Sequence, residues 1–201
     1  MKSMIEQRQT TTAIGRTLKS QLTILGGFIL FIWLLEIVDL VIFQGGLDGL
    51  GVRPRTLSGL VGIFFMPFLH NGLGHVLANT IPFLVLGWLV MIRRTADFYF
   101  VTAVVILVSG FGVWLLGGPN TVHIGASGLI FGFFGFLVLR GYFERSFFSI
   151  ALAIIVIFFY GGLIWGVLPT FQAGVSWLGH FFGFVGGAVS AYLVTTRSYN
   201  T

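Results

Sequence analysis

The chain has no cysteine and few charged residues, which make up 8% of its 201 residues. Without cysteine it can form no disulfide framework, no thiolate nucleophile and no cysteine-ligated metal site. So little charge beside 56% hydrophobic residues excludes an ordinary soluble globular domain. The composition instead predicts a single domain that resides in a lipid bilayer.

Acidic residues are scarcer than basic ones, with 6 Asp and Glu against 11 Lys and Arg and a formal net charge of +5. A basic balance can indicate nucleic-acid binding. Here, however, the basic residues stand in short clusters between apolar runs and form no continuous patch. We interpret them as signals of membrane topology, and we expect no nucleic-acid partner.

Six apolar runs are long enough, or nearly so, to cross a hydrocarbon core ~30 Å thick as helices. They cover residues 21–43, 74–92, 98–117, 127–140, 147–165 and 177–196. An even number of spans places both termini on one side. If that side is the cytoplasm, it carries most of the basic residues, namely Lys2, Arg8, Arg16, Lys19, Arg93, Arg94, Arg140, Arg145 and Arg197. The positive-inside rule therefore predicts an all-α, six-helix polytopic bundle with N-in and C-in orientation.

The predicted domain plan consists of a cytoplasmic tail at 1–20, a transmembrane domain at 21–196 and a cytoplasmic tail at 197–201. The first span lacks a small-residue cleavage site, so we expect an uncleaved anchor. Residues 44–73 form a long external segment that Gly and Pro interrupt, yet it is amphipathic enough to lie partly in the membrane interface. No internal repeat of the kind common in transporters is visible.

Polar side chains inside the spans are functional candidates, because in hydrocarbon they cost free energy unless they pair or face water. At 1.5 Å per residue, Ser127 lies roughly 20 Å from Arg140, which marks the end of its span. Counting residues in the same way from Arg93 and Arg197, at the ends of two other spans, places Asn79, His75 and His180 at about the same depth in the membrane as Ser127. Four polar groups from three spans are thus predicted to share one layer that opens toward the external face.

The chemistry of this layer is that of acyl transfer. A serine hydroxyl becomes a nucleophile when a neutral imidazole takes its proton, and His180 is placed to do this for Ser127. His75 and Asn79, at i and i+4 of one helix, can donate hydrogen bonds to a developing oxyanion. The backbone N–H of Ser127, in the first turn of its helix, is a third donor.

Five glycines accompany these residues. Gly125 and Gly128 keep Cβ atoms away from the turn that must admit a substrate backbone. On the last span, glycines recur every four residues and make a smooth face for close approach to the span that carries the serine; they are Gly179, Gly183 and Gly187. Such close contact is what a catalytic pair shared by two helices requires.

A buried carboxylate that could orient His180 is missing from spans two to six, because Asp97 and Glu144 belong to the cytoplasmic side. Asp39, in the first span, is the only acid at a suitable height, and we interpret it as an interfacial or packing residue. The sequence therefore predicts a Ser-His dyad. It contains no H-E-x-x-H helix and no His/carboxylate cluster, so we expect neither a metal nor another cofactor.

Over residues ~21 to 196 the chain resembles the rhomboid family of intramembrane serine proteases. Three motifs carry the resemblance, in order on spans two, four and six: HNGLGHVLAN (His70 to Asn79), GASG (Gly125 to Gly128) and GHFFGFVGG (Gly179 to Gly187). G-x-S-G alone is weak, whereas the three motifs together are specific. Family members often carry a Trp-Arg pair in the first external loop, where this chain has Val52-Arg53.

The resemblance implies a Ser127 nucleophile, a His180 base, and an oxyanion site formed by His75, Asn79 and the Ser127 amide. It also implies hydrolysis of peptide bonds in or beside transmembrane segments of other proteins, within membrane lipid. Substrates are expected to arrive laterally beside span five, where YGGLIWG (Tyr160 to Gly166) can flex. We expect a bacterial plasma membrane. The natural substrate and the oligomeric state stay open.

Plainer alternatives exist for each residue. A serine in a membrane helix usually bonds its own backbone, His180 can bridge helices, and the polar pair of span two can hold that span in place. A transporter or channel also places polar groups along a water-filled cavity. A third alternative is a proteolytically inactive rhomboid-like protein that binds transmembrane clients, although Ser127 and His180 are both present. Of the other histidines, His70 is expected to position a loop and His123 to be solvated.

Overall fold

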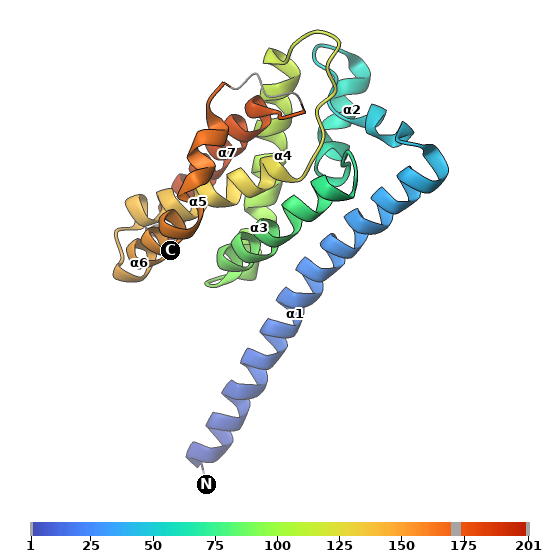
Figure 1. Cartoon of the computed structure of the whole chain (residues 1–201). Helices are drawn as coiled ribbons and strands as arrows, with labels where there is room; N and C mark the ends of the chain where they lie inside the picture. Colours follow the sequence, from blue (N-terminus) through green and yellow to red (C-terminus); the bar gives the residue numbers. More distant parts are fainter. Residues whose placement is uncertain (1, 170–173, 200–201) are drawn as a thin grey trace.

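The fold is known from a computed structural model, which describes residues 2–169 and 174–199, with side chains described for 13–169 and 174–196. Figure 1 shows a bundle of helices with one long helix extending away from it. The elements in chain order are α1 (Lys2–Val38), η1 (Asp39–Phe43), η2 (Gly46–Leu50), α2 (Leu57–Phe65), η3 (Met66–Phe68), α3 (Leu73–Met91), α4 (Thr95–Leu116), α5 (Ser127–Glu144), α6 (Phe147–Tyr160), η4 (Gly161–Val167) and α7 (Trp177–Tyr199). The described part contains no strand, which confirms the all-α prediction.

Six helical segments of the described chain are long and apolar enough to span a membrane, as predicted. They are Ala13–Phe43, Leu73–Met91, Thr95–Leu116, Ser127–Glu144, Phe147–Val167 and Trp177–Thr196. This number of apolar helices is that of an integral, multi-pass membrane protein.

Two predicted boundaries fall short of the observed ones. The first span was predicted to begin at residue 21, but the apolar helical segment begins at Ala13, and α1 itself begins at Lys2. The fourth span was predicted to end at Arg140, but α5 continues to Glu144. Arg140 is 8% exposed and forms ion pairs within the bundle, so this charge does not mark the end of the helix. At the other end of the chain, residues 200–201 of the predicted C-terminal tail lie outside the described residues.

The long segment 44–73 is ordered around the short helix α2. Thr56 caps this helix, because its Oγ1 accepts a hydrogen bond from the Gly59 N–H at 3.0 Å. The Trp114 indole of α4 donates to the Thr56 carbonyl at 2.8 Å, and α2 packs against α4. The following turn, η3, leads to the start of α3. The segment therefore forms a fixed wall of the bundle.

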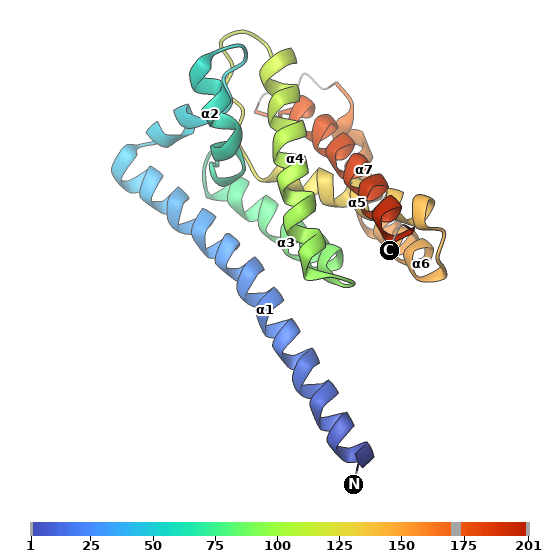
Figure 2. The ribbon, with the colours of Figure 1, turned by 180° about the vertical axis from the view of Figure 1, so that it is seen from behind.

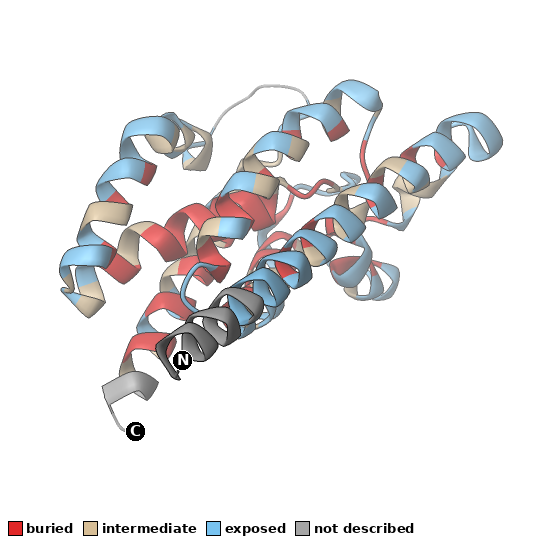
Figure 3. Ribbon diagram, turned by 90° about the horizontal axis from the view of Figure 1, so that it is seen from below, coloured by how far each residue is buried: buried red, intermediate tan, exposed pale blue. Residues whose placement is uncertain are grey.

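The core of the bundle is α5, the helix that begins with the candidate nucleophile. It packs against α3, α4, α6 and α7. Of the most apolar stretch of its span, 67% of the residues are buried, against 17% for the span Phe147–Val167 that contains α6. Its sequence from residue 128 to residue 139 is apolar on every face, as a buried helix requires. In Figure 3 the buried residues accordingly gather inside the bundle, while Figures 1 and 2 show α1 on its edge, where it packs mainly against α3.

Candidate active site

Ser127 is the first residue of α5, at the end of a tight turn. Gly125 in this turn has φ +113°, a conformation that side chains rarely adopt, and its N–H donates to the Met66 carbonyl at 2.8 Å. The Ala126 N–H donates to Nε2 of His70 at 3.3 Å. Two neighbouring segments thus fix the turn, and the Ser127 N–H, as the first of the helix, has no carbonyl of a preceding helical turn to bond to.

The hydroxyl of Ser127 lies 2.9 Å from Nε2 of His180 on α7. On the other side of the imidazole, Nδ1 lies 3.1 Å from the Gly166 carbonyl in η4. Because a carbonyl can only accept, Nδ1 carries the proton and Nε2 is left as the acceptor for the serine hydroxyl. The Phe131 ring stacks on the imidazole with centroids 4.0 Å apart and an interplanar angle of 6°. The imidazole is therefore held in one orientation and one tautomer.

The two helices that carry this pair meet through glycines. A Cβ atom at Gly183 of α7 would lie 2.2 Å from the carbonyl oxygen of Gly128 on α5. One turn further, a Cβ at Gly187 would lie 2.0 Å from the carbonyl oxygen of Gly132. Any side chain at either position would push the backbones apart. A Cβ atom at Gly179 would lie 2.9 Å from the Ser176 hydroxyl oxygen, and the Gly179 carbonyl oxygen lies 3.5 Å from the Cβ position of Gly128 on α5.

A hydrogen bond from α4 also holds the start of α7. The buried Ser109 hydroxyl donates to the Gly179 carbonyl at 3.0 Å. A Cβ atom at Gly128 would lie 2.9 Å from that hydroxyl oxygen. Ser109 thus ties the first turn of α7 to α4, and Gly128 leaves it the space to do so.

His75 and Asn79 of α3 face the serine. The Asn71 N–H donates to Nδ1 of His75 at 3.3 Å, so the neutral ring carries its proton on Nε2. A Cβ atom at Gly125 would lie 2.9 Å from Nε2 of His75 and 3.7 Å from the Ser127 hydroxyl, which places the three residues side by side. Nδ2 of Asn79 donates to the His75 carbonyl at 2.8 Å, and its second hydrogen is free for another acceptor.

A cavity of about 430 Å³ adjoins these groups. Its polar lining includes the four predicted residues, Ser127, His180, His75 and Asn79. Apolar side chains from α5 and η4 complete the wall, among them Ile130, Phe131 and Leu163. The structure thus brings the predicted layer together around one cavity that is mainly apolar and has a few convergent polar groups, which is the usual character of a small ligand site.

His70 and His123 serve the loops around the site. His70 is 1% exposed and supports the nucleophile turn through Ala126, and burial together with the neighbouring His75 lowers the pKa of His70 to about 4. His123 was expected to be solvated, but its Nδ1 lies 2.7 Å from the Ser176 hydroxyl and its Nε2 lies 2.9 Å from Thr121. Burial lowers the pKa of His123 as well. Both imidazoles therefore act as neutral hydrogen-bonding groups.

The acids of the first span hold backbone turns. Oδ1 of Asp39 accepts from the Leu47 N–H at 2.9 Å, and Oε1 of Glu36 accepts from the Gly72 N–H at 2.7 Å. In the described part of the chain, the imidazole of His180 has the Gly166 carbonyl rather than a carboxylate as its second partner. Nor does that part bring three His, Asp or Glu side chains close enough together to hold a metal ion.

Sequence reasoning missed three contributors to the site. The Gly166 carbonyl orients His180, Phe131 stacks on it, and Ser109 fixes the first turn of α7. A backbone acceptor has no side-chain signature, and a phenylalanine in an apolar helix is indistinguishable from packing. The segment containing Gly166 had been singled out only as a flexible gate.

Comparison with known proteins shows what the chain is similar to. A family model described as the Rhomboid domain matches residues 58–197, which include every residue of the site described above. Uncharacterized proteins of Mycobacterium tuberculosis (strain H37Rv) and Mycobacterium bovis are each 41% identical to the chain over 196 residues, covering 92% of it and 81% of their own length. An uncharacterized protein of Mycobacterium leprae is 41% identical over 182 residues, covering 87% and 71%. The chain belongs to the rhomboid family.

Proposed function

We propose that the protein is an intramembrane serine endopeptidase that cleaves peptide bonds in or near transmembrane segments of other membrane proteins. The observation that carries the proposal is the 2.9 Å contact between the Ser127 hydroxyl and Nε2 of His180, beside a cavity inside a membrane-spanning bundle. Rhomboid family membership supports the same reaction class. The proposed catalytic pair is a dyad.

In the proposed reaction, Nε2 of His180 takes the proton of Ser127 as the serine oxygen attacks the substrate carbonyl. The Gly166 carbonyl accepts a hydrogen bond from Nδ1–H throughout and stabilises the imidazolium that forms, a task that a carboxylate performs in triads. His180 then protonates the leaving amine, and the C–N bond breaks to leave an acyl-enzyme. Water activated by the same imidazole attacks the ester, releases the acid and returns the proton to Ser127.

The oxyanion of the tetrahedral intermediate is assigned to three donors. The Ser127 N–H stands at the positive end of the α5 dipole. The Nε2–H of His75 lies beside the nucleophile turn, and Asn79 offers its free amide hydrogen from one helical turn further on. These groups are held before substrate arrives, so they stabilise the developing charge without reorganisation.

Substrates are proposed to approach beside α6. This helix is the least buried of the six spans, and η4, which carries the Gly166 carbonyl, follows it directly. A substrate helix hides its carbonyls in its own hydrogen bonds, so small or helix-breaking residues at the scissile bond favour cleavage. Partners are therefore transmembrane proteins with a segment that unwinds readily.

The membrane orientation is proposed from charge. Both chain ends and the turns near Arg93 and Arg145 are assigned to the cytoplasm, because basic residues concentrate there. Residues 1–20 and 197–201 then belong to cytoplasmic segments on either side of the six-span domain, and the active site opens to the external face. A bacterial plasma membrane is the proposed location.

The test uses full-length protein in liposomes with a model transmembrane substrate. Wild type is expected to cleave it, while Ser127→Ala and His180→Ala are expected to be inactive although they fold normally. Gly74→Ala is a matched control, because a methyl group there meets nothing within 4 Å. Cleavage that persists in Ser127→Ala would contradict the nucleophile assignment. Solute flux that survives Ser127→Ala would favour a transporter, and client binding without cleavage by wild type would favour an inactive rhomboid-like protein.

A further inference from the structure

An apolar groove follows the seam between α3 and α6, both of which pack on α5. Its volume is about 440 Å³, and its lining includes Val85 and Leu89 of α3 and Ile155 and Phe159 of α6. These side chains are accessible, since Phe159 is 72% exposed and Ile155 is 52% exposed. The groove lies on the lipid-facing surface of two membrane spans, so hydrocarbon is its natural occupant.

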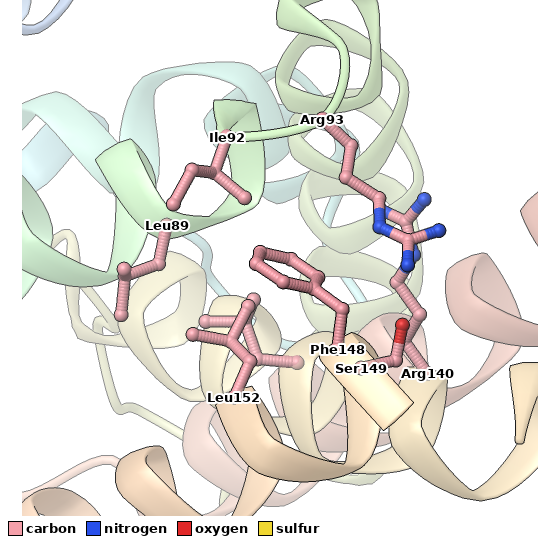
Figure 4. A pocket seen from close by; sticks show the side chains of 8 residues that line it. Leu89, Ile92, Arg93, Arg140, Phe148, Ser149 and Leu152 are labelled. Atoms are coloured by element: carbon pink, nitrogen blue, oxygen red, sulfur yellow. The ribbon is translucent and has the colours of Figure 1, made fainter. Parts of the chain in front are cut away.

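One end of the groove leads to an arginine. Leu89 also lines a small adjoining hollow, together with Ile92, Arg93 and Phe148 (Figure 4). Figure 4 shows the guanidinium nitrogens on one side of this hollow and the aliphatic side chains on the other. The Arg93 guanidinium lies 5.1 Å from the centre of the Phe148 ring, which holds it at the mouth of the hollow.

Arg93 retains capacity for a further partner. It donates to Glu144 and, at 3.0 Å, to the Ser146 hydroxyl, which uses two of the five N–H donors of a guanidinium. Its side chain is still 30% exposed. Phosphate is a favourable acceptor for an arginine that has free hydrogens, because the bonds are charge-assisted.

The surroundings of Arg93 are positively charged overall. Its ion-pair network contains two arginines and two acids, Arg93 and Arg140 with Asp97 and Glu144. Two more exposed arginines, Arg94 and Arg145, adjoin the network in sequence, and neither has an ion pair in the described part of the chain. An anion at Arg93 would therefore meet a net positive field.

A second groove on the same bundle provides the contrast. It lies between α4 and α7, has a volume of about 380 Å³, and is lined by apolar residues such as Leu107, Phe111 and Val185. None of the described residues that line it is a lysine or an arginine. An acyl chain fits both grooves, because apolar side chains line both. The α3–α6 groove differs in that it leads to Arg93, which can bind a charged headgroup.

We propose that the α3–α6 groove is a binding site for an anionic phospholipid. The phosphate lies at Arg93, and an acyl chain follows the groove past Leu89 toward Ile155 and Phe159. The ligand comes from the leaflet at the Arg93 end of the bundle. This binding requires no peptidase activity, so Ser127→Ala is expected to bind lipid as wild type does.

Native mass spectrometry of the full-length protein in detergent tests the proposal with phosphatidylglycerol and phosphatidylcholine of identical chains. Wild type is expected to retain phosphatidylglycerol about fivefold more strongly, the effect of one basic residue beside an anionic lipid. Arg93→Gln is expected to abolish this preference, while Arg93→Lys keeps most of it because the charge remains. An unchanged preference in folded Arg93→Gln would overturn the assignment of the headgroup.

The groove is tested separately, because Arg93 also holds Glu144 and its loss could disturb folding. Ile155→Trp breaks no ion pair and fills the groove, so retention of both lipids is expected to fall several-fold. The matched control is Leu107→Trp in the α4–α7 groove, which is expected to leave phosphatidylglycerol retention unchanged. Equal losses in the two variants would show that the α3–α6 groove is no lipid site.

Discussion

Gly183→Ala is expected to disable the protein by moving a helix rather than by touching the catalytic groups. The new Cβ would lie 2.2 Å from the Gly128 carbonyl oxygen, whereas ordinary contacts begin at 3.4 Å. The difference, 1.2 Å, is the distance by which α7 and α5 must separate at this point. Gly183 lies one helical turn from His180, so most of that shift reaches the imidazole.

A shift of this size breaks the dyad. Added to the present 2.9 Å, it places Nε2 of His180 about 4 Å from the Ser127 hydroxyl, beyond hydrogen-bond reach. Misplacement of a catalytic group by about 1 Å costs on the order of 100-fold in rate. Overpacking of this kind typically costs about 1–3 kcal/mol of stability, which leaves a folded protein to assay.

The assay is the initial rate of cleavage of a fluorogenic transmembrane substrate, with the melting temperature of each variant measured in parallel. Gly183→Ala is expected to lose about 100-fold in rate. Gly74→Ala, which adds the same methyl group in open space on α3, is expected to match wild type. A folded Gly183→Ala protein that cleaves within about twofold of wild type would refute the reasoning, because the glycine contact would then not set the dyad distance.

Three further predictions concern the surroundings of the site. Between pH 6.5 and pH 4 the His70 imidazole is protonated in the unfolded chain but neutral in the folded chain, so the free energy of unfolding should fall by up to roughly 3 kcal/mol as pH drops through this range. Denaturant titrations at the two pH values should show a smaller fall for His70→Gln. Asp39→Asn keeps an oxygen for the Leu47 N–H and should retain substantial cleavage activity, whereas complete loss in a folded protein would reveal a third catalytic group. Arg140→Gln leaves Asp97 buried without its cation and should lower stability by about 3 kcal/mol in a thermal melt, while exposed Arg94→Gln should change it by under about 0.5 kcal/mol.

Much of the fold was predictable from the sequence because the bilayer imposes a simple length rule. Six apolar runs of about 20 residues gave six spans, and counting residues along them brought Ser127, His180, His75 and Asn79 to one height. The four side chains do line one cavity. The helical rise is constant, so residue counts measure depth reasonably well even when boundaries are inexact.

The inexact boundaries have a physical cause. Arg140 was read as the end of its span, but a buried arginine that is paired with Asp97 and Glu144 can lie inside a helix. Sequence hydropathy scores each charge alone and cannot detect that Arg140 and Glu144 on α5 and Asp97 on α4 compensate one another. The ordered structure of residues 44–73 was likewise not visible in the sequence, because its α2 helix is stabilised by contacts with α4, which is distant in the chain.

Features that depend on backbone geometry were beyond prediction. The orientation of His180 depends on the carbonyl of Gly166, and the nucleophile turn depends on the imidazole of His70 accepting from the Ala126 N–H. Any residue can supply a backbone carbonyl or amide, so no residue type marks these bonds. The group that orients His180 is a backbone carbonyl rather than a carboxylate.

The central claim is that Ser127 is a nucleophile activated by His180. Its most direct measurement is covalent labelling of the purified protein with a fluorophosphonate, followed by mass spectrometry of the modified peptide. The label is expected on Ser127 in wild type, to be absent from Ser127→Ala, and to be lost from folded His180→Ala. Labelling of another serine, or labelling of Ser127 that is undiminished in His180→Ala, would contradict the claim.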